Sequence, residues 1–100
     1  MSDEIAGAVL EGASLTIRQV CAVCAIEEEW IVHHVQEGLI SVSGTTVTEW
    51  RFSSADLRRA QRMRVLERDF DAAPELAALV ADLQEELDDL RARLRRAGIG

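Results

Sequence analysis

The sequence predicts a mainly α-helical chain that carries one small two-stranded hairpin and ends in a long leucine-rich helix. Three observations support this fold class. Apolar residues recur every three or four positions over most of the chain. The segment 39–52 changes to an alternating pattern around the turn sequence SGTT. Near the end of the chain, leucine repeats with heptad spacing.

Length and charge limit the function classes. The chain has 100 residues, enough for one domain with an appended helix, and its net charge is −7. An acidic chain repels the phosphate backbone of nucleic acid, so the charge favours a basic protein partner. The sequence shows no secretion signal and no apolar run of membrane-spanning length. Two cysteines do not make a disulfide framework, and we expect a cytoplasmic protein.

The first half of the chain predicts an arm followed by a short helix. Residues 1–14 are expected to form an N-terminal arm that could include a short strand. In the helix that follows, Thr16 can cap the N-terminus and Gln19 lies three residues later, which is the spacing of a capping box. One face of this helix collects four apolar residues, Ile17, Val20, Cys21 and Cys24.

A turn near Ala25 leads to a second helix, predicted for Glu27 to Glu37 and ended by Gly38. Its apolar face carries Ile31, His34 and Val35. The opposite face carries Glu29, Val32, His33, Gln36 and Glu37, with Trp30 at the flank. We interpret His34 as a hydrogen-bonded core histidine and His33 as an exposed residue.

The next two elements are the hairpin and a basic helix. The alternating apolar residues of the hairpin are Ile40, Val42, Val47 and Trp50. The helix 53–70 begins with Ser53 and Asp56 at capping spacing. It carries five arginines, Arg58, Arg59, Arg62, Arg64 and Arg68. They can contact phosphates, or they can pair with nearby acids, including Asp82, Glu85 and Glu86 of a dimer partner; we favour pairing.

The last helix starts at Pro74, which suits a first helical turn. A narrow leucine seam needs a second helix to cover it, which predicts a homodimer, and opposite charges at the two helix ends favour antiparallel pairing. The alternative is that the helix folds back onto its own domain. The seam residues, at spacings of four and three, are Leu76, Val80, Leu83, Leu87, Leu90 and Leu94.

This order of elements is typical of a winged helix-turn-helix domain, 15–70, followed by a dimerisation helix, 71–100. The run LTIRQVCAVCAIEEEWIVHHVQEGLI resembles the MerR-type winged-helix family of transcription regulators. In that family an arginine stands where this chain has Val32, and two aromatics stand where it has His33 and His34. A dimeric, DNA-binding MerR-type regulator is therefore one reading of the sequence.

Two stretches, LTIRQVCAVCAIEEEWI and TEWRFSSADLRRAQRMRVLERDF, resemble a divergent branch of that family, the chaperone modulators called CbpM. The resemblance covers residues 15–96. It implies a protein that binds the J-domain of a CbpA- or DnaJ-like co-chaperone and blocks its stimulation of the Hsp70 chaperone DnaK. It implies neither an enzyme nor a cofactor.

The acidic start of the second helix is the candidate contact for such a partner, because a J-domain presents a basic helix. Trp30 is a candidate aromatic anchor, although it could simply pack in the core. The first-turn glutamates could instead only complement the helix dipole. The expected partner-binding residues are Glu28, Glu29, Trp30, His33 and Glu37.

Other chemistry finds little support in the sequence. Cys21 and Cys24 are spaced as in a zinc motif, but His33 and His34 point about 100 degrees apart on a helix, so at most one can join them. We expect two core thiols and no metal. No catalytic triad, paired-carboxylate cleft or phosphate-binding glycine loop is present, so an enzyme is not expected.

Overall fold

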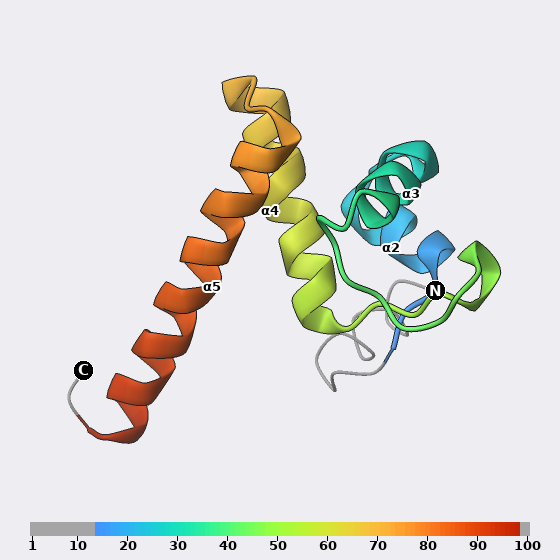
Figure 1. Cartoon of the computed structure of the whole chain (residues 1–100). Helices are drawn as coiled ribbons and strands as arrows, with labels where there is room; N and C mark the ends of the chain where they lie inside the picture. The colour runs from blue at the N-terminus through green and yellow to red at the C-terminus, as the bar shows by residue number, and fades with distance from the viewer. Residues whose placement is uncertain (1–13, 99–100) are drawn as a thin grey trace.

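The computed structural model describes residues 14–98, which are mainly helical. Figure 1 shows a compact body, formed by α2, α3 and the following loop, joined through α4 to a helix, α5, that runs back along α4 and beyond it. In chain order the elements are α2 (Ile17–Cys24), α3 (Glu28–Gln36), the 3-10 helix η1 (Val47–Glu49), α4 (Ser54–Phe70) and α5 (Pro74–Arg96). Of the arm predicted for 1–14, all but Ser14 lies outside the described residues.

Local signals in the sequence set the ends of α2 and α3. Thr16 and Gln19 form the predicted capping box, with 2.9 Å between the Thr16 amide nitrogen and Gln19 Oε1. Ala25 then adopts a left-handed conformation, with φ of 54°, which ends α2 and turns the chain toward α3. Gly38, with φ of 76°, follows α3. The predicted turn and glycine stop are confirmed.

The predicted two-stranded wing is wrong for the residues that the structure describes. Between α3 and α4 the chain forms η1 and a single antiparallel bridge, Ser43 with Arg51. Thr46 explains the difference, because its capping box with Glu49 starts a helical turn where the second strand was expected. The loop still contributes to the core through Ile40 and Trp50, which are both buried.

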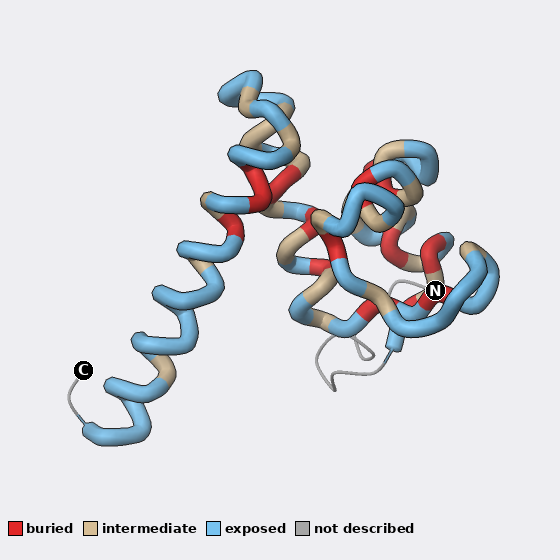
Figure 2. Tube along the Cα trace, in the orientation of Figure 1, coloured by how far each residue is buried: buried red, intermediate tan, exposed pale blue. Residues whose placement is uncertain are grey.

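The core lies where α2, α3, α4 and the loop converge, as the buried segments in Figure 2 show. Leu15 and Phe52 close its lower edge by exchanging two backbone hydrogen bonds of 2.8 Å. His34 is buried in this core with 2% of its surface exposed. The largest fully buried side chains are Phe52, Leu15, Ile31, Ile40, Met63 and Val20.

α4 and α5 are joined by small side chains and by ion pairs. Arg59 in α4 donates to Asp82 and Glu85 in α5, at 2.6 and 2.8 Å, and its Nε donates to the Leu39 carbonyl at 2.7 Å. One arginine therefore links the loop after α3 to both helices of the hairpin. The α5 residues buried against the rest of the chain are alanines, which let two helices approach closely, and they are Ala77, Ala78 and Ala81.

The leucines of α5 point away from α4. Successive residues are separated by 100° on a helix, so the alanine face and the leucine seam lie on opposite sides. α5 does fold back onto its own domain, but it does so through alanines and leaves the seam uncovered in the described chain. Leu76, Leu83, Leu87, Leu90 and Leu94 are each 46 to 53% exposed, Val80 is half-buried, and Leu79 joins the stripe at 55%.

The link between α4 and α5 spans 71–73, where the boundary between the two predicted domains was placed. The division into 15–70 and 71–100 stays a prediction. Within residues 14–98, each helix is too short or too polar to span a bilayer.

Candidate protein-interaction surface

The outer face of α3 carries an acidic surface, which we define as Glu28, Glu29, His33 and Glu37. All four residues are exposed. Glu29, His33 and Glu37 follow one another at intervals of four, so they form a single row along the helix, and His33 Nε2 lies 3.9 Å from Glu37 Oε1. Glu28 lies at the edge of this face nearest to α2, where its charge reaches Cys21. The structure therefore brings three of the five predicted partner-binding residues, Glu29, His33 and Glu37, into one row, and Glu28 is exposed beside its start.

Trp30, the fifth predicted residue, faces a different direction. Its ring stacks on His34 with 3.7 Å between ring centroids, and its Nε1 donates to Glu67 Oε1 in α4 at 3.0 Å. It is half-buried and packs against the core. Trp30 is therefore held against α4 at the flank of the acidic surface, and its role as an aromatic anchor for a partner stays a prediction.

His34 confirms the prediction of a hydrogen-bonded core histidine. Its Nδ1 lies 2.7 Å from the Trp30 carbonyl oxygen, which can only accept, so Nδ1 carries a hydrogen. Its Nε2 lies 2.7 Å from Glu67 Oε2, and one proton must lie between these two atoms. Trp30, His34 and Glu67 thus form a closed polar network that fixes α3 against α4.

Most of the arginines of α4 are paired with acidic residues of the same chain. Of the α4 arginines, Arg59 and Arg62 pair with acids of α5, and Arg64 lies 3.9 Å from Glu27. Arg68 pairs with Asp69. Within residues 14–98 only Arg58 of this helix forms no ion pair. The arginine stripe is therefore mostly neutralised by acids of the same chain.

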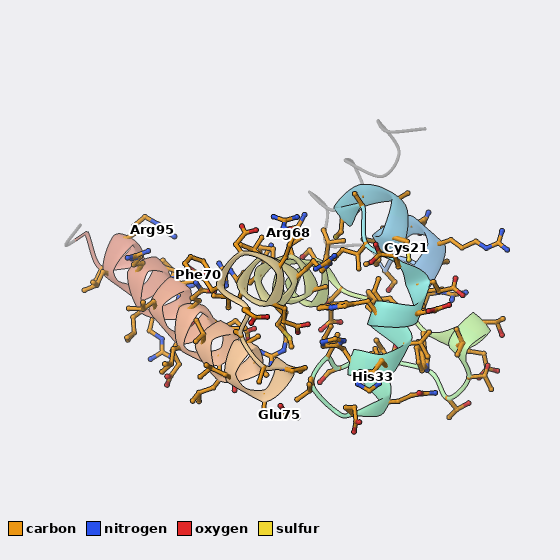
Figure 3. All side chains as sticks on the ribbon, turned by 90° about the horizontal axis from the view of Figure 1, so that it is seen from above. Cys21, His33, Arg68, Phe70, Glu75 and Arg95 are labelled. Atoms are coloured by element: carbon orange, nitrogen blue, oxygen red, sulfur yellow. The ribbon has the colours of Figure 1, made fainter. Side chains whose placement is uncertain are left out.

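Cys21 and Cys24 lie on α2, where Figure 3 labels Cys21, and both pack against the core. Burial raises the pKa of the Cys24 thiol to about 11, with a smaller contribution from Cys21, against a hydrogen bond from Gln61 that lowers it. Burial and the charge of Glu28 raise the pKa of Cys21. Both thiols therefore stay protonated near neutral pH, which suits neither a nucleophile nor a metal ligand. Within residues 14–98 no three His, Cys, Asp or Glu residues are grouped to hold a metal ion.

The acidic surface and the α5 leucines lie on separate parts of the molecule. Figure 3 shows α4 between α5 on one side and the α2–α3 pair, with His33, on the other. The chain thus presents two separate exposed features, one charged and one apolar.

Sequence reasoning missed the residues that hold these features in place. Glu67 is not among the residues that the sequence singled out, yet it anchors both Trp30 and His34. The sequence does indicate that Glu67 faces the core, because Leu57, Ala60 and Glu67 share one helical face. The role of Arg59 in binding the Leu39 carbonyl depends on how the loop returns to α4, and no local pattern predicts it.

Comparisons with known proteins show which family this chain is similar to. A model of the family described as MerR HTH family regulatory protein matches residues 15–97. The chaperone modulatory protein CbpM of Coxiella burnetii (strain Dugway 5J108-111) is 29% identical over 92 residues, which cover 91% of this chain and 87% of that protein. The CbpM proteins of Pseudomonas entomophila (strain L48) and Pseudomonas putida (strain W619) are 29% and 30% identical over 77 residues, 77% of this chain and 76% of each of theirs. No solved structure matches the chain.

Proposed function

Since this chain belongs to the MerR HTH family, on the branch of the chaperone modulatory protein CbpM, we propose that it binds the J-domain of a CbpA- or DnaJ-like co-chaperone. Binding would prevent that J-domain from stimulating an Hsp70 chaperone. In this proposal the chain acts as a binding protein rather than an enzyme, and it works in the cytoplasm.

The acidic surface of α3 is the observation that carries this proposal. In a DNA-reading helix-turn-helix the second helix brings cations to the phosphates and bases. Here the whole of α3 contains no Lys or Arg, and three of the four exposed residues of the surface are glutamates. A surface of this charge attracts a basic helix and steers it during association. Glu28, Glu29, His33 and Glu37 are the proposed contacts, and Trp30 holds them in place.

A helix-turn-helix fold is part of the same proposal. α2, the turn at Ala25 and α3 supply the helix-turn-helix, and the loop that contains η1 follows it in place of a β-hairpin wing. Such a scaffold presents one helix on a rigid support, which suits a protein partner as well as it suits DNA.

The experiment is a binding titration of the purified chain with a purified J-domain, paired with a gel-shift assay on random duplex DNA at low salt. The proposal expects a 1:1 complex per chain with the J-domain, and a complex with DNA that is weak or absent. Tight DNA binding with a steep salt dependence, combined with no J-domain complex, would instead favour a MerR-type transcription regulator. The family description supports that second function, but the charge of α3 opposes it.

We also propose that the chain is a homodimer joined through α5. Its leucine stripe, Leu76, Val80, Leu83, Leu87, Leu90 and Leu94, is too continuous to be left in water by chance. Replacing Leu83 and Leu87 by Asp should convert a dimer to a folded monomer in a sedimentation experiment. A dimer of unchanged stability would exclude this stripe as the interface.

A further inference from the structure

The first half of α4 and the second half of α5 enclose an open cleft of charged side chains. Figure 1 shows α5 separating from α4 as it runs away from the hairpin turn, which leaves this region open. The cleft has a volume of about 350 Å³. Its lining residues are Ala55, Arg58, Arg62, Glu85, Asp88 and Asp89.

Positive charge is in excess at this cleft. Arg58 is exposed and forms no ion pair within residues 14–98, and the same holds for Arg91, which lies one turn beyond Asp88 on α5. The charges of both arginines reach Asp88, which already pairs with Arg62. The other two acids of the cleft are also paired, Glu85 with Arg59 and Asp89 with Arg93. Arg58 and Arg91 are therefore two cations that lack a partner in the described chain.

The N-terminal segment, residues 1–13, is attached close to Arg58. Leu15 and Phe52 form an antiparallel pair that exchanges two backbone hydrogen bonds. In such a pair the neighbouring residues also face each other, so Ser14 lies opposite Ser53, the residue that caps α4. From Ser53 to Arg58 is about 8 Å along the helix. The segment before Ser14 is therefore tethered within two helical turns of an unpaired arginine.

The sequence of the N-terminal segment is complementary to the cleft. It contains three acids, Asp3, Glu4 and Glu11, and neither Lys nor Arg. An extended chain spans about 3.3 Å per residue, so Glu11 can lie as far as about 10 Å from Ser14, and Glu4 about 33 Å. The first distance is enough to reach Arg58, and the second is enough to cross to α5. Length and charge therefore both allow this segment to occupy the cleft.

We propose that the N-terminal segment of this chain docks in the cleft, where Glu11 pairs with Arg58 and the neighbouring acids Asp3 and Glu4 face Arg91. Exposed ion pairs are individually weak. The covalent tether compensates for this weakness, because it gives the acids a high effective concentration at the cleft. The docked segment neutralises the cations that α4 leaves free, and guanidinium groups of this kind are what hold phosphates in nucleic-acid complexes. The segment thus shields the basic helix of the chain from polyanions.

Cross-linking tests the contact directly. The chain contains no Lys, so Arg58→Lys introduces a single side-chain amine at the cleft. A carbodiimide joins an amine to a carboxylate in contact with it, with loss of water. Peptide mass mapping should therefore find an amide bond between position 58 and Glu11. The matched control is Arg68→Lys, about 21 Å along α4 from Ser54, which should form no bond to residues 1–13.

Two cross-linking results would overturn the proposal. One is the absence of any bond from position 58 to residues 1–13 in a variant that circular dichroism shows to be folded. The other is an equal yield of such bonds from Arg58→Lys and Arg68→Lys, which would mean that the segment contacts the surface at random. Mixing isotope-labelled with unlabelled chains identifies the copy that supplies the segment. Bonds within one copy support the proposal, and bonds mainly between copies contradict it.

The reactivity of Arg58 tests the contact without changing the cleft. In a variant that combines Asp3→Asn, Glu4→Gln and Glu11→Gln, phenylglyoxal should modify Arg58 about threefold faster than in the wild type, because no carboxylate of the segment pairs with it. Arg95, at the far end of α5, is the internal control and should react at the same rate in both proteins. An unchanged rate at Arg58 would exclude the ion pair with Glu11.

Shielding is measured with random duplex DNA at low salt as the polyanion. The same triple variant should bind this DNA about threefold more tightly than the wild type, because cations near phosphates strengthen such complexes. Adding Arg58→Gln should cancel the gain. Adding Arg18→Gln on α2, which changes the net charge equally, should leave most of it. A gain that both additions reduce equally would come from net charge alone, and it would overturn the shielding role of the segment, as would the absence of any gain.

Discussion

His34 Nε2 and Glu67 Oε2 lie 2.7 Å apart and join two helices whose residues are 33 positions apart in sequence. His34 belongs to α3, which carries the acidic surface, and Glu67 belongs to α4, the helix shared by both parts of the molecule. The second oxygen of the same carboxylate accepts from Trp30 Nε1 at 3.0 Å. One glutamate therefore determines how the acidic surface is oriented relative to the rest of the chain.

We predict that Glu67→Ala lowers the free energy of unfolding by about 3 kcal/mol, because two donors in the network lose their acceptor and one of them is buried. For a domain of this size the midpoint temperature should fall by about 10–20 °C. The measurement is thermal or urea unfolding at a fixed protein concentration, since a dimer's stability depends on concentration. Gln36→Ala, on the exposed side of α3, is the control and should change stability by less than about 0.5 kcal/mol.

Glu67→Gln tests the same network more finely. An amide keeps one acceptor for Trp30 but replaces the carboxylate next to His34. The free energy of unfolding should therefore fall less than it does for Glu67→Ala. If both variants unfold at the wild-type midpoint, the network does not contribute to stability and the orientation of α3 must be set elsewhere.

Charge reversal on the acidic surface should weaken the proposed J-domain complex. Glu29→Lys places a positive charge in the middle of the row formed with His33 and Glu37, and we expect about a tenfold rise in the dissociation constant. Glu75→Lys, which changes the net charge equally but lies on α5, should change it less than about threefold. Calorimetric titration with a purified J-domain measures both.

Salt should reveal how the acidic surface acts. Exposed charges are screened beyond about 8 Å at physiological ionic strength, so the wild-type association rate should fall as salt rises. Glu29→Lys should flatten that dependence. If Glu29→Lys and Glu75→Lys weaken J-domain binding equally, net charge controls the affinity and the α3 surface does not.

The sequence was sufficient to predict features that depend on local patterns. The capping boxes at Thr16 and Ser53, the stop at Gly38 and the buried His34 follow from short-range spacing, and the structure contains each of them. The leucine stripe follows from periodicity, although Leu79 was missed because a strict heptad does not include it.

η1 was missed although its signal is local, because the alternating apolar pattern around SGTT favoured a strand over the capping-box spacing of Thr46 and Glu49. Features that depend on distant contacts were not predictable in the same way. The orientation of Trp30 depends on Glu67, which lies 37 positions away. For Trp30 the sequence left both a surface position and core packing open, and only the distant contact with Glu67 shows that its side chain packs against the core.

The ion pair between Arg62 and Asp88 should make the α4–α5 hairpin sensitive to acid. The hydrogen bond from Arg62 lowers the pKa of Asp88 below its ordinary value of 3.8, and the charges of Arg62, Arg91 and Arg58 add to this effect. A lowered folded-state pKa contributes stability that is present above 3.8 and is lost as the pH falls through the folded value. The free energy of unfolding, measured in urea, should therefore fall below about pH 4 more steeply for the wild type than for Asp88→Asn. The same dependence of stability on pH below about pH 4 in both proteins would show that the pair has no influence on stability.

The two thiols of α2 should react slowly with alkylating reagents in the folded chain. A thiol with a pKa of about 11, as burial gives Cys24, is about 0.1% thiolate at pH 8, whereas a free cysteine is about one quarter thiolate. Iodoacetamide should therefore modify Cys24 in a Cys21→Ser background at least about 100-fold more slowly than it modifies the same chain in urea, as followed by intact mass.

The alkylation of Cys21, measured in a Cys24→Ser background, should become faster when Glu28→Gln removes the negative charge that raises the pKa of Cys21. Cys24 should not respond to that change, because Glu28 is not among the causes of its shift. Native labelling as fast as in urea would mean that α2 opens readily, and the support for α3 would then be weaker than its packing indicates.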